Sequence, residues 1–219
     1  MSAAEGHVAT NAAEGHASMN AAEGRLANVS AALLLGGASE RMGTDKAQLE
    51  IGGEPAAAVL AARLALLCEE VLLVGGTPPP GACGRRVADP AGPRSALRGL
   101  VAALEAASAE RVLVVAVDLL GVTPDLLLAL IAAPEADVVA PRTPRGAEPL
   151  CALYRREPVL AEARARLAAG RLALHELLAA LSVHWLEGAD LRAVDDSGSA
   201  LVNVNTPEEL AAFRAEVAP

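Results

Sequence analysis

The chain has 219 residues, a formal net charge of −9 and a hydrophobic content of 53%, while aromatic residues make up only 1%. This length is typical of one globular domain that folds without a disulfide framework or a structural metal. The three cysteines show no C-x-x-C pairing, which argues against both kinds of framework, and the acidic charge argues against a nucleic-acid partner. No apolar run approaches the roughly 18 residues of a membrane helix and no signal-peptide pattern is present, so we expect a cytoplasmic protein.

Residues 3–29 consist of three copies of a nine-residue repeat that begins Ala-Ala-Glu-Gly. Each copy contains a glycine and few large apolar residues, so the repeat cannot fill a core. We therefore expect residues 1–29 to form a disordered tail and residues 30–219 to form the folded domain. His7 and His16 are expected to be solvated residues of this tail rather than metal ligands.

From Ser30 onward, predicted strands and helices alternate. Apolar runs predict strands over Ala31–Leu35, Val71–Val74, Arg86–Ala88, Val112–Val117, Asp137–Ala140, Leu150–Tyr154, Val183–Leu186 and Val202–Val204. Apolar spacing and capping residues predict helices over Pro55–Leu67, Ala96–Ala107, Pro158–Ala169 and Leu174–Leu181, and after the N-terminal caps Thr123 and Thr206. The alternation predicts an α/β fold with a mainly parallel sheet and helices on both faces. Ligands of such sheets bind beyond the carboxyl ends of the strands.

The segment Leu33–Lys46 ends the first of these strands with two glycines and places Arg41 close to Lys46 in sequence. Gly36 and Gly37 allow the backbone to approach a ligand closely, and successive N–H groups can bind an anion. The two cations would neutralise further phosphate oxygens. Because the residues of the P-loop and of the dinucleotide fingerprint are absent, the pattern predicts a phosphate-binding loop of another kind. An ordinary strand-to-helix turn is the alternative.

Two further polar features stand at predicted strand ends. Asp118 follows the valine-rich apolar run Val112–Val117, and a carboxylate at the end of such a buried strand is well placed to hold Mg²⁺. The alternative, a helix cap, is already provided by Thr123. Asn203 and Asn205 are two residues apart in a predicted strand, so their side chains are expected to face the same side.

The segment Leu34–Lys46 resembles the Leu-Ala-Gly-Gly-x-Ser-x-Arg-Met-Gly-x-Asp-Lys signature of the molybdenum cofactor guanylyltransferases (the MobA family), with nine of ten specified residues matching. Leu35 stands where the family has Ala, and we expect its bulk to face the place where nucleotide and backbone meet. Asp118 corresponds to the acid of the family's Asp-x-Pro, with Leu120 in place of the proline. The segment Val202–Leu210 resembles the family's closing Asn-x-Asn-Thr-Pro-Glu-Glu-Leu. Glu148–Leu153 resembles the segment on the second-substrate side.

The resemblance covers about residues 30–214 and implies a Rossmann-like, three-layer nucleotidyltransferase that transfers GMP from GTP to molybdenum-molybdopterin, with pyrophosphate leaving. It implies that Lys46, Arg41 and Asp118 are catalytic and that Asp118 binds Mg²⁺. The implied nucleotide-binding residues are Leu34, Leu35, Gly36, Gly37, Lys46, Gly75, Asp89, Asp118, Asn203 and Asn205. For Asp89, which precedes Pro90, a turn-forming role is an alternative. The expected partners are the two substrates, with transient contacts to cofactor-delivery proteins or molybdoenzymes.

Two alternatives to guanylyl transfer are compatible with parts of the sequence. The related cytidylyltransferases have Ala-Ala-Gly at Leu35–Gly37 and Asp-x-Asp-Thr-Pro at Asn203–Pro207, so both differences favour guanine. A homologue that binds nucleotide or pterin without turnover would fit the altered Leu35, the altered turn after Asp118 and the expanded segment Gly92–Gly99. The retained Lys46 and Asp118 favour an enzyme, because a passive binder has no need of the metal carboxylate.

Overall fold

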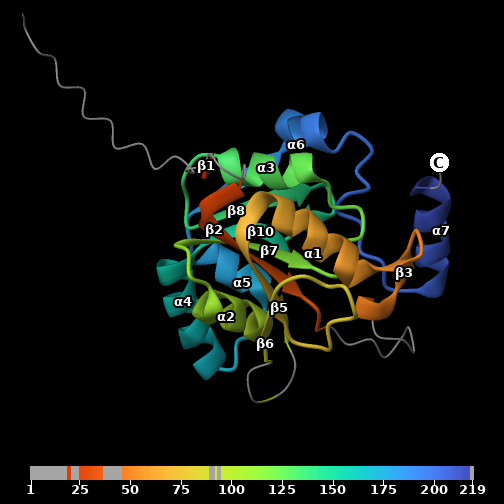
Figure 1. The fold of residues 1–219 in the computed structure, drawn as a ribbon. Helices are drawn as coiled ribbons and strands as arrows, with labels where there is room; N and C mark the ends of the chain where they lie inside the picture. The colour runs from red at the N-terminus through yellow and green to blue at the C-terminus, as the bar shows by residue number, and fades with distance from the viewer. Residues whose placement is uncertain (1–18, 21–24, 37–45, 89–91, 93–94, 218–219) are drawn as a thin grey trace, which may run out of the picture.

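The computed structural model describes residues 19–20, 25–36, 46–88, 92 and 95–217. Within these residues a nine-stranded sheet forms the centre of the molecule (Figure 1). Its main path runs β11-β8-β10-β7-β2-β5-β6, with β1 added to β2 and β9 added to β8. The bounds are β1 Met19–Asn20, β2 Arg25–Leu34, β5 Cys68–Val74, β6 Arg85–Val87, β7 Arg111–Ala116, β8 Val138–Thr143, β9 Gly146–Ala147, β10 Cys151–Arg155 and β11 Val183–Glu187. Along the main path every strand is parallel to its neighbour except β10, which is antiparallel to both β7 and β8. The mainly parallel sheet is therefore confirmed.

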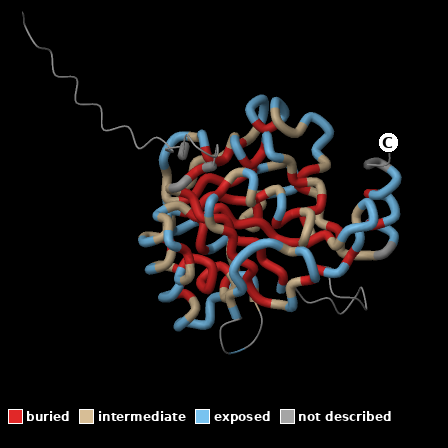
Figure 2. Tube along the Cα trace, in the orientation of Figure 1, coloured by how far each residue is buried: buried red, intermediate tan, exposed pale blue. Residues whose placement is uncertain are grey.

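Helices cover both faces of the sheet, as expected. One face carries α1 (Ala56–Leu67), α3 (Pro124–Ala132) and α6 (Gly188–Val194), and the other carries α2 (Ala96–Ala106), α4 (Arg156–Ala168) and α5 (Leu174–Ala179) (Figure 1). Because successive side chains of a strand point to opposite faces, Leu33 of β2 packs in the α1/α3 layer and Leu34 in the α2/α4 layer. Figure 2 shows the buried residues gathered around the sheet. None of the described helices is long and apolar enough to cross a membrane.

A third, smaller core lies beside the sheet. The 3-10 helix η2 (Lys46–Gln48), the hairpin of β3 (Glu50–Ile51) and β4 (Glu54–Pro55), and the C-terminal helix α7 (Pro207–Val217) surround it. Its buried members, which we call the C-terminal cluster, are Leu49, Ala56, Leu120, Val204, Leu210 and Phe213. The Arg214 guanidinium adds two hydrogen bonds to the Glu50 carbonyl, at 2.6 and 3.1 Å.

Most predicted elements are confirmed to within a few residues, and so are both capped helix starts. Thr123 Oγ1 accepts a hydrogen bond from the Leu126 amide at 3.3 Å. Glu209 N donates to Thr206 Oγ1 at 3.1 Å, while the Glu209 carboxylate accepts from Thr206 N at 3.0 Å. Both caps are local interactions, which is why a sequence pattern can reveal them.

The structure differs from the sequence predictions in three ways. The predicted strand at Val202–Val204 is wrong: the segment has no strand ladder, and a 2.9 Å hydrogen bond from Val204 N to Asp118 O attaches it to the turn that follows β7. The hairpin β3–β4, β9 and α6 are not predicted at all. The boundary predicted after residue 29 falls inside β2, because Leu26 and Val29 of the third repeat copy are buried core residues. Residues 1–18 and 21–24, including His7 and His16, lie outside the described residues.

Candidate active site

The carboxyl ends of three neighbouring strands meet at one edge of the sheet. Leu35 N donates to Val74 O at 2.9 Å, which joins the end of β2 to that of β5. Val117 N donates to Leu34 O at 3.0 Å, which joins β7 to β2. Gly36, Gly75 and Asp118 therefore leave the sheet side by side, where ligands of parallel sheets bind.

Leu35 does not face this edge. The residue is 2% exposed, and its side chain belongs to the core under α1 and α3. A Cβ atom on Gly76, whose φ is +54°, would lie 3.0 Å from the Leu35 Cβ, so glycine at position 76 makes room for the leucine. The expectation that the bulk of Leu35 faces the nucleotide is wrong, because the residue turns into the core. Leu34 is also buried, so both leucines can reach a ligand only through their backbone.

Two carboxylates and an amide converge beside the β7 end. Glu148 accepts hydrogen bonds from Asn203 Nδ2 and from the Leu150 amide, each at 3.2 Å. Burial raises the pKa of Glu148, and the negative charge of Asp118 raises it further. Asn203 thus lies beside Glu148, and its role in nucleotide binding stays a prediction. Asn205 stands at the helix cap, where its backbone N–H donates to the Glu209 carboxylate at 2.6 Å.

Glu148 is not among the predicted nucleotide or metal residues, although it lies in the segment that resembles the second-substrate side. It precedes β10, whose direction is opposite to that of its neighbours, so the beginning of β10 lies at the edge where the parallel strands end. Looking for site residues only where predicted strands end therefore misses Glu148, which stands where a strand begins. The direction of β10 is what places Glu148 at the site, and the local sequence does not reveal that direction.

The acidic pair fits a divalent cation. Glu148 and Asp118 repel each other, and a bound cation would relieve that repulsion. Mg²⁺ is usually held by one or two carboxylates together with phosphate oxygens of the substrate and water. Among the described residues no group of three or more His, Cys, Asp or Glu could hold a metal, so substrate and water would have to complete the coordination.

Much of the predicted phosphate loop lies outside the described residues, including Gly37 and Arg41, and so does Asp89. Lys46 begins η2, and the chain after it is anchored by the buried Ala47 and Leu49. The Leu49 carbonyl accepts a 2.6 Å hydrogen bond from the Ala56 amide, which ties this segment to the start of α1. The roles of Lys46, Arg41 and Asp89 stay predictions.

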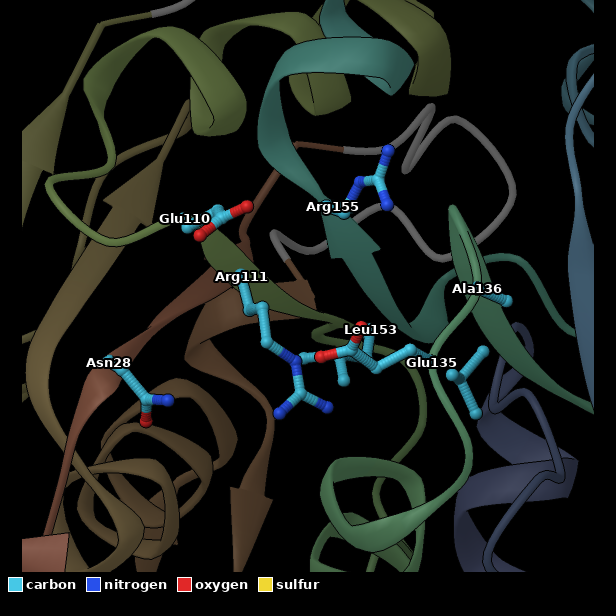
Figure 3. A pocket seen from close by; sticks show the side chains of 8 residues that line it. Asn28, Glu110, Arg111, Glu135, Ala136, Leu153 and Arg155 are labelled. Atoms are coloured by element: carbon cyan, nitrogen blue, oxygen red, sulfur yellow. The ribbon is translucent and has the colours of Figure 1, made fainter. Parts of the chain in front are cut away.

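A cavity of about 730 Å³ opens at the ends of β8 and β11, beside α6 and residues 195–198. Its arginines are Arg142, Arg145 and Arg192. Arg142 is paired with Glu187 through a 2.9 Å hydrogen bond and lies over the Trp185 ring, 4.8 Å from its centroid. A smaller cavity of about 160 Å³ lies at the opposite edge of the sheet, where Arg111 and Asn28 line it (Figure 3). The larger cavity is therefore on the same edge as Asp118 and the smaller one is not.

The chain matches the family model of the MobA-like NTP transferase domain over residues 31–184. It is 36% identical over 193 residues to a probable molybdenum cofactor guanylyltransferase of Chloroflexus aggregans, covering 83% of this chain and 91% of that protein. It is 32% identical over 192 residues to a protein of the same description from Pelotomaculum thermopropionicum, covering 86% and 93%.

Two solved structures share the fold. One is molybdopterin-guanine dinucleotide biosynthesis protein A from Archaeoglobus fulgidus, with a TM-score of 0.71 and 21% identity, covering 85% of this chain and 97% of that one. The other is 2-C-methyl-D-erythritol 4-phosphate cytidylyltransferase from Thermus thermophilus, with a TM-score of 0.65 and 18% identity, covering 86% and 98%. At these identities the likeness concerns the fold alone.

Proposed function

The chain belongs to the MobA-like NTP transferase family of nucleotidyltransferases, and on that premise we propose that it transfers GMP from GTP to molybdenum-molybdopterin and releases pyrophosphate. The observation that carries the proposal is the convergence of Asp118, Glu148 and Asn203 at the carboxyl edge, next to the segment that matches the guanylyltransferase signature. The names of the curated relatives support guanine as the base.

The chain's own residues would act mainly by positioning and electrostatics, as is general for phosphoryl-type transfer. Lys46 and Arg41 would bind the phosphate groups and stabilise the charge that develops on their oxygens. The backbone at Leu34–Gly37 would approach the nucleotide, with Gly75, Asp89 and the Asn203–Asn205 segment completing its site. A terminal phosphate oxygen of the pterin would attack the α-phosphorus in line, and the bond to pyrophosphate would break.

Asp118, with Glu148 beside it, would hold Mg²⁺, which when bound would neutralise negative charge on the triphosphate. This role needs both carboxylates ionised. Because the pKa of Glu148 is raised by burial and by Asp118, we expect metal binding to weaken as the pH falls toward the range in which Glu148 takes up a proton.

The second substrate would occupy the cavity at the ends of β8 and β11. Arg145 and Arg192 line it and could pair with the anionic groups of the pterin. Gly198 lines this cavity, and the next residue, Ser199, packs directly on Gly121 in the turn after Asp118, so the chain leads from the cavity to that turn within a few residues. We further propose that the protein acts in the cytoplasm and passes its product on in transient contacts with cofactor-delivery proteins or molybdoenzymes.

The test of base and chemistry uses purified protein, Mg²⁺, molybdenum-molybdopterin and either GTP or CTP, with pyrophosphate release measured. We expect release with GTP. Release with CTP alone would point to the cytidylyltransferase alternative, and binding of GTP without release would point to a non-catalytic homologue.

The test of the metal ligand is Asp118→Ala. We expect a loss of transfer of about 100-fold or more, because a positioned charge at the reacting phosphates is removed. Asp125→Ala, an exposed acid in the first turn of the next helix, is the matched control and should keep full activity. Full transfer by Asp118→Ala would refute the assignment.

A further inference from the structure

The turn that carries Asp118 is held by few bonds of its own. It joins β7 to α3, and its internal hydrogen bonds run from Leu119 N to Ala116 O at 3.2 Å and from Val122 N to Leu119 O at 3.3 Å. Both are at the long end of the range for backbone bonds. The orientation of the Asp118 carboxylate must therefore depend on groups outside the turn.

One such group is a guanidinium from another element. Arg63, on α1, donates from Nη1 to the Val122 carbonyl at 2.7 Å and to the Leu120 carbonyl at 3.3 Å. The side chain is half-buried, and burial lowers the pKa of Arg63. A cation taken out of water in this way needs fixed acceptors, and here the acceptors are two carbonyl dipoles of the Asp118 turn. The pairing therefore restrains both carbonyls.

Two more contacts restrain the turn from other sides. Leu120 is 1% exposed in the C-terminal cluster, where it packs with Leu49 and Val204. At Gly121 a Cβ atom would lie 2.5 Å from the Ser199 carbonyl oxygen, so the backbone of residues 199–200 presses directly on the turn. Of the contacts from outside the turn, that of Arg63 is polar and comes from a side chain, and the Val204 amide adds a main-chain hydrogen bond to the Asp118 carbonyl at 2.9 Å.

We propose that Arg63 is a positioning residue whose guanidinium sets the backbone of residues 118–122 and thereby aims the Asp118 carboxylate at the metal and phosphate position. The inference rests on the proposed function for the role of Asp118. Arg63 acts through the turn, since its hydrogen bonds go to the carbonyls of Leu120 and Val122.

The experiment compares Arg63→Met, which keeps an aliphatic stem and loses the donors, with Arg63→Lys, which keeps the charge. The matched control is Arg111→Met. Arg111 is also half-buried with a pKa lowered by burial, and it also donates to a main-chain carbonyl, Ile131 O at 2.7 Å, but at the opposite edge of the sheet (Figure 3). Three quantities are measured on the full chain: melting temperature, amide hydrogen exchange of residues 117–122, and the Mg²⁺ concentration for half-maximal transfer.

We expect Arg63→Met and Arg111→Met to lower the melting temperature similarly. Only Arg63→Met should speed exchange in residues 117–122 and raise the half-maximal Mg²⁺ concentration, by about tenfold, as is usual when a group that orients a metal ligand is lost. Arg63→Lys should restore part of both effects. If Arg63→Met does not fold, the same exchange rates and half-maximal Mg²⁺ concentration are compared between Arg63→Lys and Arg111→Met.

The inference would be overturned if Arg63→Met changed the amide exchange of residues 117–122 and the half-maximal Mg²⁺ concentration no more than Arg111→Met does. A second result would also overturn it: Asp118→Ala abolishes transfer, while Arg63→Met shows faster exchange in residues 117–122 but an unchanged half-maximal Mg²⁺ concentration. Faster exchange together with a fully active Asp118→Ala would support the effect of Arg63 on the turn and refute the proposed role of Asp118 instead.

Discussion

Glu70→Gln tests the polar network that joins four segments at the amino edge of the sheet. The Glu70 carboxylate, in β5, accepts hydrogen bonds from the buried Ser30 hydroxyl of β2 at 2.6 Å and from Arg85 of β6 at 2.8 Å. It also accepts from both the amide and the hydroxyl of Ser108, each at 2.8 Å, in the turn before β7. Gln keeps the shape of the side chain and removes its charge, so the exchange isolates the electrostatic part of the network.

The loss of unfolding free energy expected in Glu70→Gln follows from the pKa of Glu70. Burial raises it, but the bonds from Ser108, Ser30 and Arg85 outweigh burial and lower the pKa to about 2, from an ordinary value of 4.5. At about 1.4 kcal/mol per pKa unit this gap corresponds to about 3 kcal/mol. Because Arg85 is 55% exposed, solvent screening reduces the figure, and we expect a loss of about 2 kcal/mol in Glu70→Gln.

The sign of the pH dependence is set by the depressed pKa. The folded protein binds the proton of Glu70 less readily than the unfolded chain, so the stabilisation is complete above pH 4.5 and disappears as the pH falls toward 2. Urea unfolding of both proteins at pH 7, 5, 4 and 3 measures the difference. Glu105→Gln is the control: this exposed glutamate bonds to Arg164, and its removal should cost less than 1 kcal/mol by the usual worth of surface pairs. A difference that does not shrink in acid, or one no larger than the control, would refute the reasoning.

Two further predictions concern the candidate site. Gly121→Ala should lower the free energy of unfolding in urea by about 2 kcal/mol, because the added methyl group meets the Ser199 carbonyl. The control is Gly99→Ala in the middle of α2, where the nearest atom to the added methyl group lies at 3.6 Å. This control should raise the free energy of unfolding by about 0.5 kcal/mol, because alanine favours a helix more than glycine does. Equal effects of the two would contradict the close approach at Gly121. Glu148→Gln should be more stable than the parent at pH 7 and no different at pH 3, because the raised pKa of Glu148 means that the folded state disfavours its ionised form. Glu148→Gln should also transfer GMP more slowly. A gain of stability that is equal at pH 7 and pH 3 would argue against a buried negative charge on Glu148.

Short-range patterns are sufficient for most of the fold. The buried strand β7 is a valine-rich apolar run, and α3 and α7 begin at caps whose partners lie three residues away. The resemblance of Leu34–Lys46 to the guanylyltransferase signature likewise depends on adjacent residues alone. These features are readable because the groups that stabilise them are near one another in the chain.

Long-range packing decided the rest. The antiparallel direction of β10 brings Glu148 to Asp118, and the buried side chain of Leu35 packs closely against Gly76. The segment at Val204 has a strand-like sequence but forms no ladder, and its hydrogen bond from Val204 N goes to Asp118 O in the turn after β7. In the sequence Arg63 has no feature that distinguishes it from other helix residues, and only the fold shows that it donates hydrogen bonds to carbonyls of the Asp118 turn. Sequence alone therefore determined most of the elements, the phosphate-loop signature and the family, because these depend on neighbouring residues. Which side chains meet at the site depends on strand direction and close packing between distant segments, and only the tertiary structure decides those.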